Sequence, residues 1–210
     1  MRLLKFLIGL LLLPAWPGFS IAFLDQLSRI GTLGAEGAAF LAGLLVCAII
    51  YFMGHRLPFL QVFGHEMTHA LWSLIFRGRV RSFYASKYGG QVKVTKSNFL
   101  VSLAPYFFPL YTIAVVILSF FIDKRYQLAV FFLIGFTLAH HVLSTIDSLK
   151  IRQSDITKTG LLFSMSLIFI VNLCVIIAIV DFVVAEVSFL EFVEDGVGNT
   201  VEVFRMLEDF

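Results

Sequence analysis

Charged residues are scarce in this chain, and their scarcity excludes most classes of soluble protein. Asp, Glu, Lys and Arg make up 14% of the 210 residues, whereas an ordinary soluble domain has about a quarter. Hydrophobic residues make up 59%, and the mean hydropathy is +0.92. A monomer this apolar cannot cover itself in water, and a disordered chain needs more charge. From a net charge of +2 we expect no concentrated basic face of the kind that binds nucleic acids. We therefore expect a membrane protein in contact with a lipid bilayer, with no nucleic-acid partner.

Cysteine is nearly absent as well, which argues against a disulfide-stapled fold. The two that occur, Cys47 and Cys174, each lie in the middle of an apolar run. No internal repeat, low-complexity tract or flexible linker marks a second domain. The composition changes only near the end, where residues 187–210 contain six acidic side chains against a single arginine. We therefore expect one membrane domain over residues 1–186 and an acidic tail over 187–210, with a short amphipathic helix near 201–207.

In place of charged residues and cysteines, the chain contains long apolar runs. A helix needs roughly 20 apolar residues to cross the hydrocarbon core, with about 17 as the lower limit. Lipid offers no partner for backbone hydrogen bonds, so such runs must be helical. The sequence therefore predicts an all-α polytopic membrane protein with about six transmembrane or re-entrant helices. The six runs are 6–24, 37–53, 57–76, 99–122, 128–146 and 160–180.

The positions of Lys and Arg predict the orientation of these helices, because basic loops stay in the cytoplasm. The first run, which contains Pro14 and Pro17, fits a re-entrant helix, a spanning helix or a signal peptide. The two arrangements that place most basic residues inside agree on the rest of the chain. Both place the loops 77–98 and 150–158 in the cytoplasm and the acidic tail on the far side. We expect a multi-pass protein of the cell membrane.

A non-helical segment follows the third run. Residues 80–85 and 91–95 are rich in β-forming side chains, and a turn with two glycines over 87–90 joins them. This pattern predicts a short membrane-associated β-hairpin. Such a segment is either a solvated basic connector or an edge that pairs with an extended peptide.

The sharpest motif in the chain is His65-Glu66-Met67-Thr68-His69. On a helix, residues four apart lie on one face, so both imidazoles can reach one metal ion. Glu66 can then point at a metal-bound water rather than at the metal. Ionisable groups inside an apolar run are costly and mark functional sites by default. The alternative is a hydrogen-bonded cluster that ties helices together.

A catalytic zinc site needs a third protein ligand and leaves one position for water. Asp155 precedes the last long apolar run, and Asp147 ends the fifth one. His140, Ser144 and Asp147 lie on one helical stripe that can face the same cavity. Asp155 has a plain alternative role as a helix N-cap, and His140 and its neighbour His141 have one as packing and hydrogen-bonding residues.

These features together resemble the site-2 protease family of intramembrane zinc metallopeptidases. The resemblance rests on the motif inside an apolar helix, the hairpin-like loop after it, a helix opening with Leu103-Ala104-Pro105, and a later aspartate at the start of a helix. Gly64 to Leu71 is similar to the compact bacterial branch, which lacks a PDZ domain. The resemblance covers roughly residues 57–172 and implies a bacterial inner-membrane location.

The resemblance implies that residues 1–186 form an integral membrane metallopeptidase domain. In that family, the two motif histidines and the later aspartate bind zinc, which carries over to His65, His69 and Asp155. Glu66 becomes the general base on a zinc-bound water, and the substrates become membrane proteins or peptides. The family's usual Leu-Asp-Gly reads Ser-Asp-Ile around Asp155, so Asp147 stays as the alternative third ligand.

The same residues also fit two other functions. One is a catalytically silent membrane scaffold that keeps the metal site, and the other is a metal- or proton-coupled transporter that uses the His and Asp cluster. Neither function requires a glutamate between the two histidines, so Glu66→Gln separates them from a protease. Within the fourth run we expect Pro105 and Pro109 to kink the helix and open room beside the metal.

Overall fold

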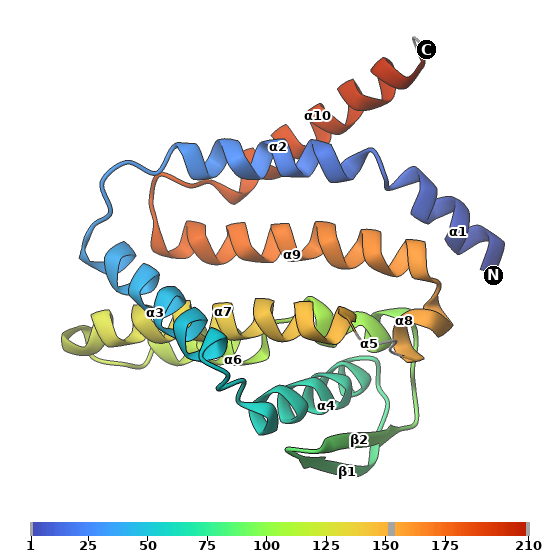
Figure 1. Ribbon diagram of the computed structural model, residues 1–210, viewed down its shortest axis with the longest axis horizontal. Coiled ribbons are helices and arrows are strands. Elements are labelled where there is room, and N and C mark those ends of the chain that lie inside the picture. The colour runs from blue at the N-terminus through green and yellow to red at the C-terminus, as the bar shows by residue number, and fades with distance from the viewer. Residues whose placement is uncertain (1, 151–153, 209–210) are drawn as a thin grey trace. The chain divides into compact units, whose positions relative to one another are not determined.

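The computed structural model describes residues 2–150 and 154–208, which form ten α-helices, two short 3-10 helices and one two-stranded sheet (Figure 1). By its contacts the chain divides into two compact units. One unit joins the two ends of the chain, up to Gly34 and from Ile156 onward, and the other is Ala35–Asp155. The elements in order are α1 Arg2–Leu11, α2 Ala15–Ser28, α3 Ala35–Phe52, α4 Pro58–Ile75, β1 Val80–Ser86, β2 Gly89–Val94, α5 Phe99–Leu103, η1 Ala104–Tyr106, α6 Leu110–Ser119, η2 Lys124–Tyr126, α7 Gln127–Lys150, α8 Ser154–Thr159, α9 Leu161–Val183 and α10 Phe189–Glu208.

Among the described residues, three to five segments are long and apolar enough to cross a membrane. Single helices qualify at Ala35–Phe52, Lys124–Lys150 and Leu161–Val183. Two further segments qualify only if a bent pair of helices is one span: Leu3–Leu11 with Ala15–Ser28, and Phe99–Tyr106 with Leu110–Ser119. These helices and the small sheet fit a helical membrane protein.

The helix that carries the motif, α4, is not among these candidate spans, although the third apolar run was expected to be one. Four strongly polar side chains lower its hydropathy: Gln61, His65, Glu66 and His69. The expected kink at Pro105 and Pro109 is present. The chain bends by 77° between Phe99–Tyr106 and Leu110–Ser119, because proline interrupts the helical hydrogen bonds.

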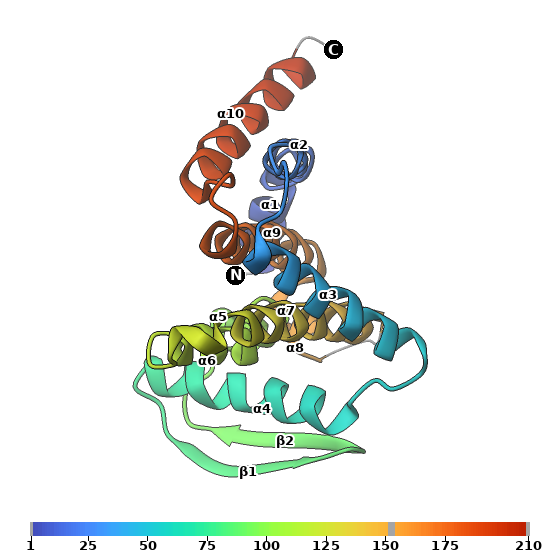
Figure 2. The same ribbon diagram turned by 90° about the vertical axis from the view of Figure 1, so that its left-hand side faces the viewer.

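Within the unit Ala35–Asp155, α3 crosses α7 at close range (Figure 2). Gly43 of α3 lies against the carbonyl of Phe132, and Gly135 of α7 lies against the carbonyl of Phe40. A Cβ atom at either glycine would overlap the facing backbone. Small residues of this kind let two membrane helices approach until their backbones touch.

The β-hairpin that the sequence predicts is present, and it lies along α4 (Figure 2). Strands β1 and β2 pair antiparallel, with Phe83 opposite Val92 and Tyr84 opposite Gln91. Phe83 packs edge-on against Phe63 of α4, with ring centroids 5.6 Å apart. Since side chains alternate along a strand, Phe83 and Val92 face α4, whereas Tyr84 and Gln91 face away from it.

Helix α4 ends in a C-terminal cap, after which the chain reverses direction and enters this hairpin. Arg77 has a positive φ of 58°, and its N–H donates to the carbonyl of Leu74. The N–H of Gly78 donates to the carbonyl of Ser73 at 2.7 Å. These two bonds form a Schellman motif, which satisfies carbonyls that the last turn of a helix leaves unpaired.

In the other unit, the acidic tail forms the 20-residue helix α10, much longer than the short helix expected near 201–207. Its Phe192, Gly196 and Thr200 recur every four residues and face α2, where Gly196 meets Phe19. Arg29 at the end of α2 forms ion pairs with Asp25, Glu191 and Asp195. The Asp25 and Glu191 carboxylates raise the pKa of Arg29. The tail is therefore packed rather than merely solvated.

Candidate metal centre

Helix α4 presents the two motif histidines on one face. The Nε2 atoms of His65 and His69 lie 3.2 Å apart, and their ring centroids are 4.9 Å apart. Only 20% of the His65 side chain and 11% of the His69 side chain are exposed. The two imidazoles thus form a shielded pair of nitrogen donors.

Asp155, in the first turn of α8, brings a carboxylate to this pair. Its Oδ2 atom lies 3.6 Å from Nε2 of His69 and 4.0 Å from Nε2 of His65. All three ligand atoms lie within 4.8 Å of one another. Around a tetrahedral ion with bonds near 2.1 Å, neighbouring ligand atoms are about 3.4 Å apart. The donors therefore already have the spacing of a metal-binding triad.

The hydrogen bonding of His69 favours metal binding. Its Nδ1 lies 2.8 Å from the carbonyl oxygen of Val101. A carbonyl only accepts, so Nδ1 carries the proton and the lone pair of Nε2 faces His65 and Asp155. Helix α5 holds this carbonyl in place, because the Asn98 side chain accepts the N–H of Val101 at 2.9 Å and caps the helix.

Glu66 lies beside the triad and against the hairpin. A Cβ atom on Gly90 of β2 would come within 2.7 Å of Cγ of Glu66 and of Cγ1 of Val62. The Glu66 carboxylate also lies within reach of the backbone N–H of Val92. The hairpin therefore fixes where Glu66 can point.

A cleft of about 450 Å³ opens in front of Glu66, between α4 and the turn of the hairpin. His65 and Glu66 line it from α4, and Lys87 and Tyr88 line it from the turn. Ser148 of α7 completes the wall. This volume admits a peptide segment next to the triad.

Asp147, the alternative third ligand, lies elsewhere. Its carboxylate is 3.4 Å from Nη1 of Arg56 and 3.0 Å from Nζ of Lys150. It does not belong to the triad of ligand atoms found among the described residues. The structure thus brings Asp155, and not Asp147, to the two histidines.

His140 and His141 line a second, smaller cavity of about 40 Å³ that His65 also lines. His140 is buried, and its Nε2 has no hydrogen-bond partner among the residues that the structure describes. The ring of Tyr111 packs edge-on to His140, with centroids 6.0 Å apart. A cavity of this size with polar walls can hold water.

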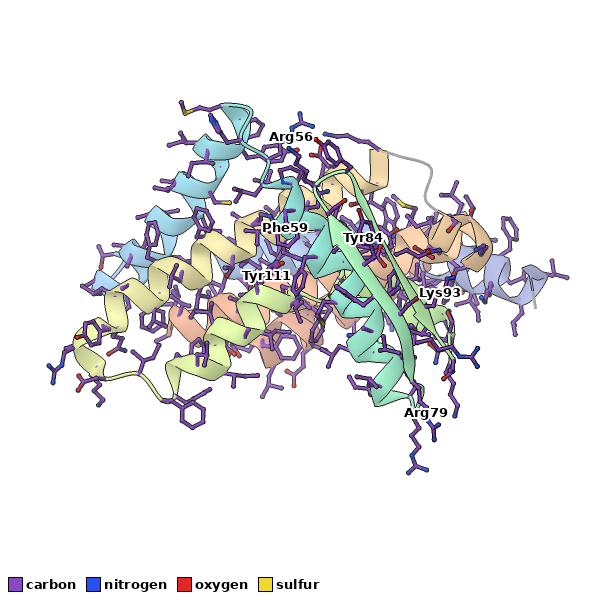
Figure 3. All side chains as sticks on the ribbon, turned by 90° about the horizontal axis from the view of Figure 1, so that it is seen from below. Arg56, Phe59, Arg79, Tyr84, Lys93 and Tyr111 are labelled. Carbon is purple, nitrogen blue, oxygen red and sulfur yellow. The ribbon has the colours of Figure 1, made fainter. Side chains whose placement is uncertain are left out.

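Three side chains of the site were not singled out from the sequence. Tyr106 is fully buried, and its ring packs edge-on to His65 with centroids 5.4 Å apart. Tyr111, labelled in Figure 3, donates from its hydroxyl to the carbonyl of Leu60 at 2.8 Å and braces α4. Gln61 lies one turn before His65, and this four-residue spacing could have predicted that both side chains lie on one face of the helix. The two tyrosines lie in apolar runs and give no such signal.

The donor set can hold a divalent metal ion, and its chemistry is not restricted to zinc. Two imidazoles and one carboxylate suit zinc, and iron or cobalt can occupy such a site as well. No protein-family model, curated protein or solved structure matches the chain.

Proposed function

We propose that the protein is an intramembrane zinc metalloprotease of the site-2 protease type, which hydrolyses peptide bonds of membrane-protein substrates. The proposal rests on the position of the Asp155 carboxylate, whose Oδ2 atom lies 4.0 Å from Nε2 of His65 and 3.6 Å from Nε2 of His69. Two histidines and a distant aspartate supply the three protein ligands of a catalytic zinc site, and the glutamate between the histidines can act as the base. His65, His69 and Asp155 would hold the ion.

Bound zinc would supply a Lewis acid and lower the pKa of a water molecule to about 7. The protein's own part in the reaction is proton transfer and positioning. Glu66 accepts a proton from the attacking water and passes it to the leaving amine. Gly90 and Val92 of the hairpin keep the Glu66 carboxylate beside the triad. Tyr106 packs on His65 and limits rotation of its ring.

The cleft between α4 and the hairpin suits an extended substrate. A helical segment hides its carbonyl groups in its own hydrogen bonds, so a membrane-spanning substrate must unwind before it is cut. An open strand edge of the hairpin can pair with the unwound segment. The three to five bilayer-length segments support a location in the cell membrane as a multi-pass protein, and the resemblance suggests the bacterial inner membrane.

Metal content of the detergent-purified protein tests the site. We expect about one zinc per chain in the wild type, and loss of zinc in His65→Ala and in Asp155→Ala. Asp147→Ala is the matched control and should retain zinc, because Asp147 pairs with Arg56 and Lys150. No zinc in the wild type after loading, or loss in Asp147→Ala alone, would contradict the assignment.

The catalytic part of the proposal is tested by Glu66→Gln. The amide cannot take the proton, so cleavage of a membrane-peptide reporter should fall by about 10²- to 10⁴-fold while zinc is retained. A metal-binding scaffold or a transporter would keep its function in this variant. Unchanged cleavage by Glu66→Gln would therefore rule out Glu66 as the base.

A further inference from the structure

The hairpin concentrates positive charge without any negative charge nearby in the sequence. Residues 77–96 contain six basic side chains, and no acidic residue occurs between Glu66 and Asp123. All six basic residues are exposed. They are Arg77, Arg79, Arg81, Lys87, Lys93 and Lys96.

Four cations outside the hairpin are neutralised by carboxylates. Arg29, Arg56, Arg125 and Lys150 each form an ion pair with at least one acidic side chain. Within the described ranges 2–150 and 154–208, none of the six hairpin cations forms an ion pair with a carboxylate. The positive charge of the hairpin is therefore available to an external anion.

The side chains of the hairpin are sorted between its two faces. The inner face packs on α4 through Phe83. The outer face presents Tyr84, which is 62% exposed, and Lys93, while Arg79 extends from the open end of the hairpin (Figure 3). At the turn, Tyr88 is 88% exposed. We call the exposed side chains Arg79, Arg81, Tyr84, Lys93 and Lys96 the basic face.

We propose that the basic face binds the phosphate groups of anionic phospholipids. Arginine and lysine are the side chains that pair with phosphate oxygens, arginine through two parallel hydrogen bonds. Exposed tyrosines favour the headgroup layer, because one end of the ring is apolar and the other is wet. A free phosphate ion would give no reason for large aromatic side chains to be exposed among the cations.

A lipid partner also agrees with the rest of the chain. Helices α3 and α7 of the same unit are long and apolar enough to cross a bilayer, which keeps the hairpin within reach of a headgroup layer. The positive charges predict that this loop lies in the cytoplasm, where the leaflet is negatively charged. The proposal does not depend on proteolysis, so the two can fail separately.

The test uses the full chain in neutral detergent, with Cys47 and Cys174 replaced by alanine and an environment-sensitive dye on Ser82→Cys. Ser82 is exposed and lies opposite Lys93. Mixed micelles with phosphatidylglycerol should shift the dye signal at a lower lipid fraction than micelles with phosphatidylcholine. Inorganic phosphate at the same concentration should have no effect, which separates a lipid headgroup from a free ion.

A charge-neutral variant, Arg79→Gln with Lys93→Gln, should raise the midpoint roughly 25-fold, about five-fold for each cation lost. The matched control, Lys124→Gln with Arg125→Gln, removes the same charge outside the hairpin and should leave the midpoint unchanged. Circular dichroism of each variant checks that it is folded. An equal response to the two lipids, equal shifts in the two variants, or a response to an acidic peptide but not to lipid would overturn the proposal.

Discussion

Replacing Gly90 with alanine tests whether the hairpin positions Glu66. The added Cβ would lie 2.7 Å from Cγ of Glu66 and from Cγ1 of Val62, and 3.0 Å from the carbonyl oxygen of Tyr84. Ordinary van der Waals contact begins near 3.4 Å, so the hairpin or Glu66 must move by about 0.7 Å. The carbonyl is backbone and cannot rotate away, so the displacement falls on Glu66 or on the whole hairpin.

Misplacement of a reacting group by about 1 Å can cost 10²-fold in rate. We therefore expect Gly90→Ala to lower reporter cleavage by up to about 100-fold. Zinc content should not change, because the three atoms nearest the new Cβ belong to Glu66, Val62 and Tyr84 and not to the metal triad. The overpacked contact should also lower the free energy of unfolding by about 1–3 kcal/mol.

Cleavage of the reporter, zinc content and thermal unfolding are measured on the same preparations. Gln91→Ala is the matched control, since Gln91 is the next residue of β2 and faces away from α4. Full activity in Gly90→Ala would refute the idea that the hairpin fixes the carboxylate. Loss of zinc together with activity would show instead that the hairpin supports the ligand helix as a whole.

Three further predictions concern contacts that position the metal site or hold helices together within one of the two units. Asn98→Ala removes the cap that holds the Val101 carbonyl against His69, and we expect zinc affinity, measured by competition with a chelator, to fall about 10-fold. Unchanged affinity would mean that the tautomer of His69 is set in another way. Gly43→Ala forces α3 off α7 and should lower the unfolding temperature, whereas Gly34→Ala, with nothing within 4 Å, should not. Arg29→Gln removes the ion pairs between α2 and α10 and should speed tryptic cleavage within α10; equal cleavage rates would show that apolar packing alone holds that helix.

Local features of this chain were predictable from the sequence. The four-residue spacing of His65 and His69 depends only on helix geometry, and the two glycines after Tyr88 depend only on turn chemistry. The hairpin and its position after the motif are confirmed. Zinc binding, proteolysis and the domain boundary at 186/187 stay predictions.

Features that depend on contacts between distant residues were not predictable from local sequence patterns alone, and the choice of Asp155 over Asp147 rested on the family resemblance. Asp147 and Asp155 both lie near helix ends, and nothing in their neighbourhoods decides which one reaches the histidines. The tertiary structure separates the two aspartates, because Arg56 from another part of the chain forms an ion pair with Asp147. The length of α10 depends in the same way on α2, whose surface gives the apolar stripe through Phe192 a partner.

The separation of the metal ligands along the chain has a consequence for how the protein is made. His69 and Asp155 are 86 positions apart. At a synthesis rate of about 5 to 20 residues per second, the aspartate follows the histidines by about 4 to 17 s. During that interval the nascent chain holds two imidazoles and a glutamate but lacks the carboxylate that completes the triad. The metal triad therefore cannot be complete while the first helices are being inserted, so the proposed hydrolytic activity would begin only after Asp155 has been synthesised.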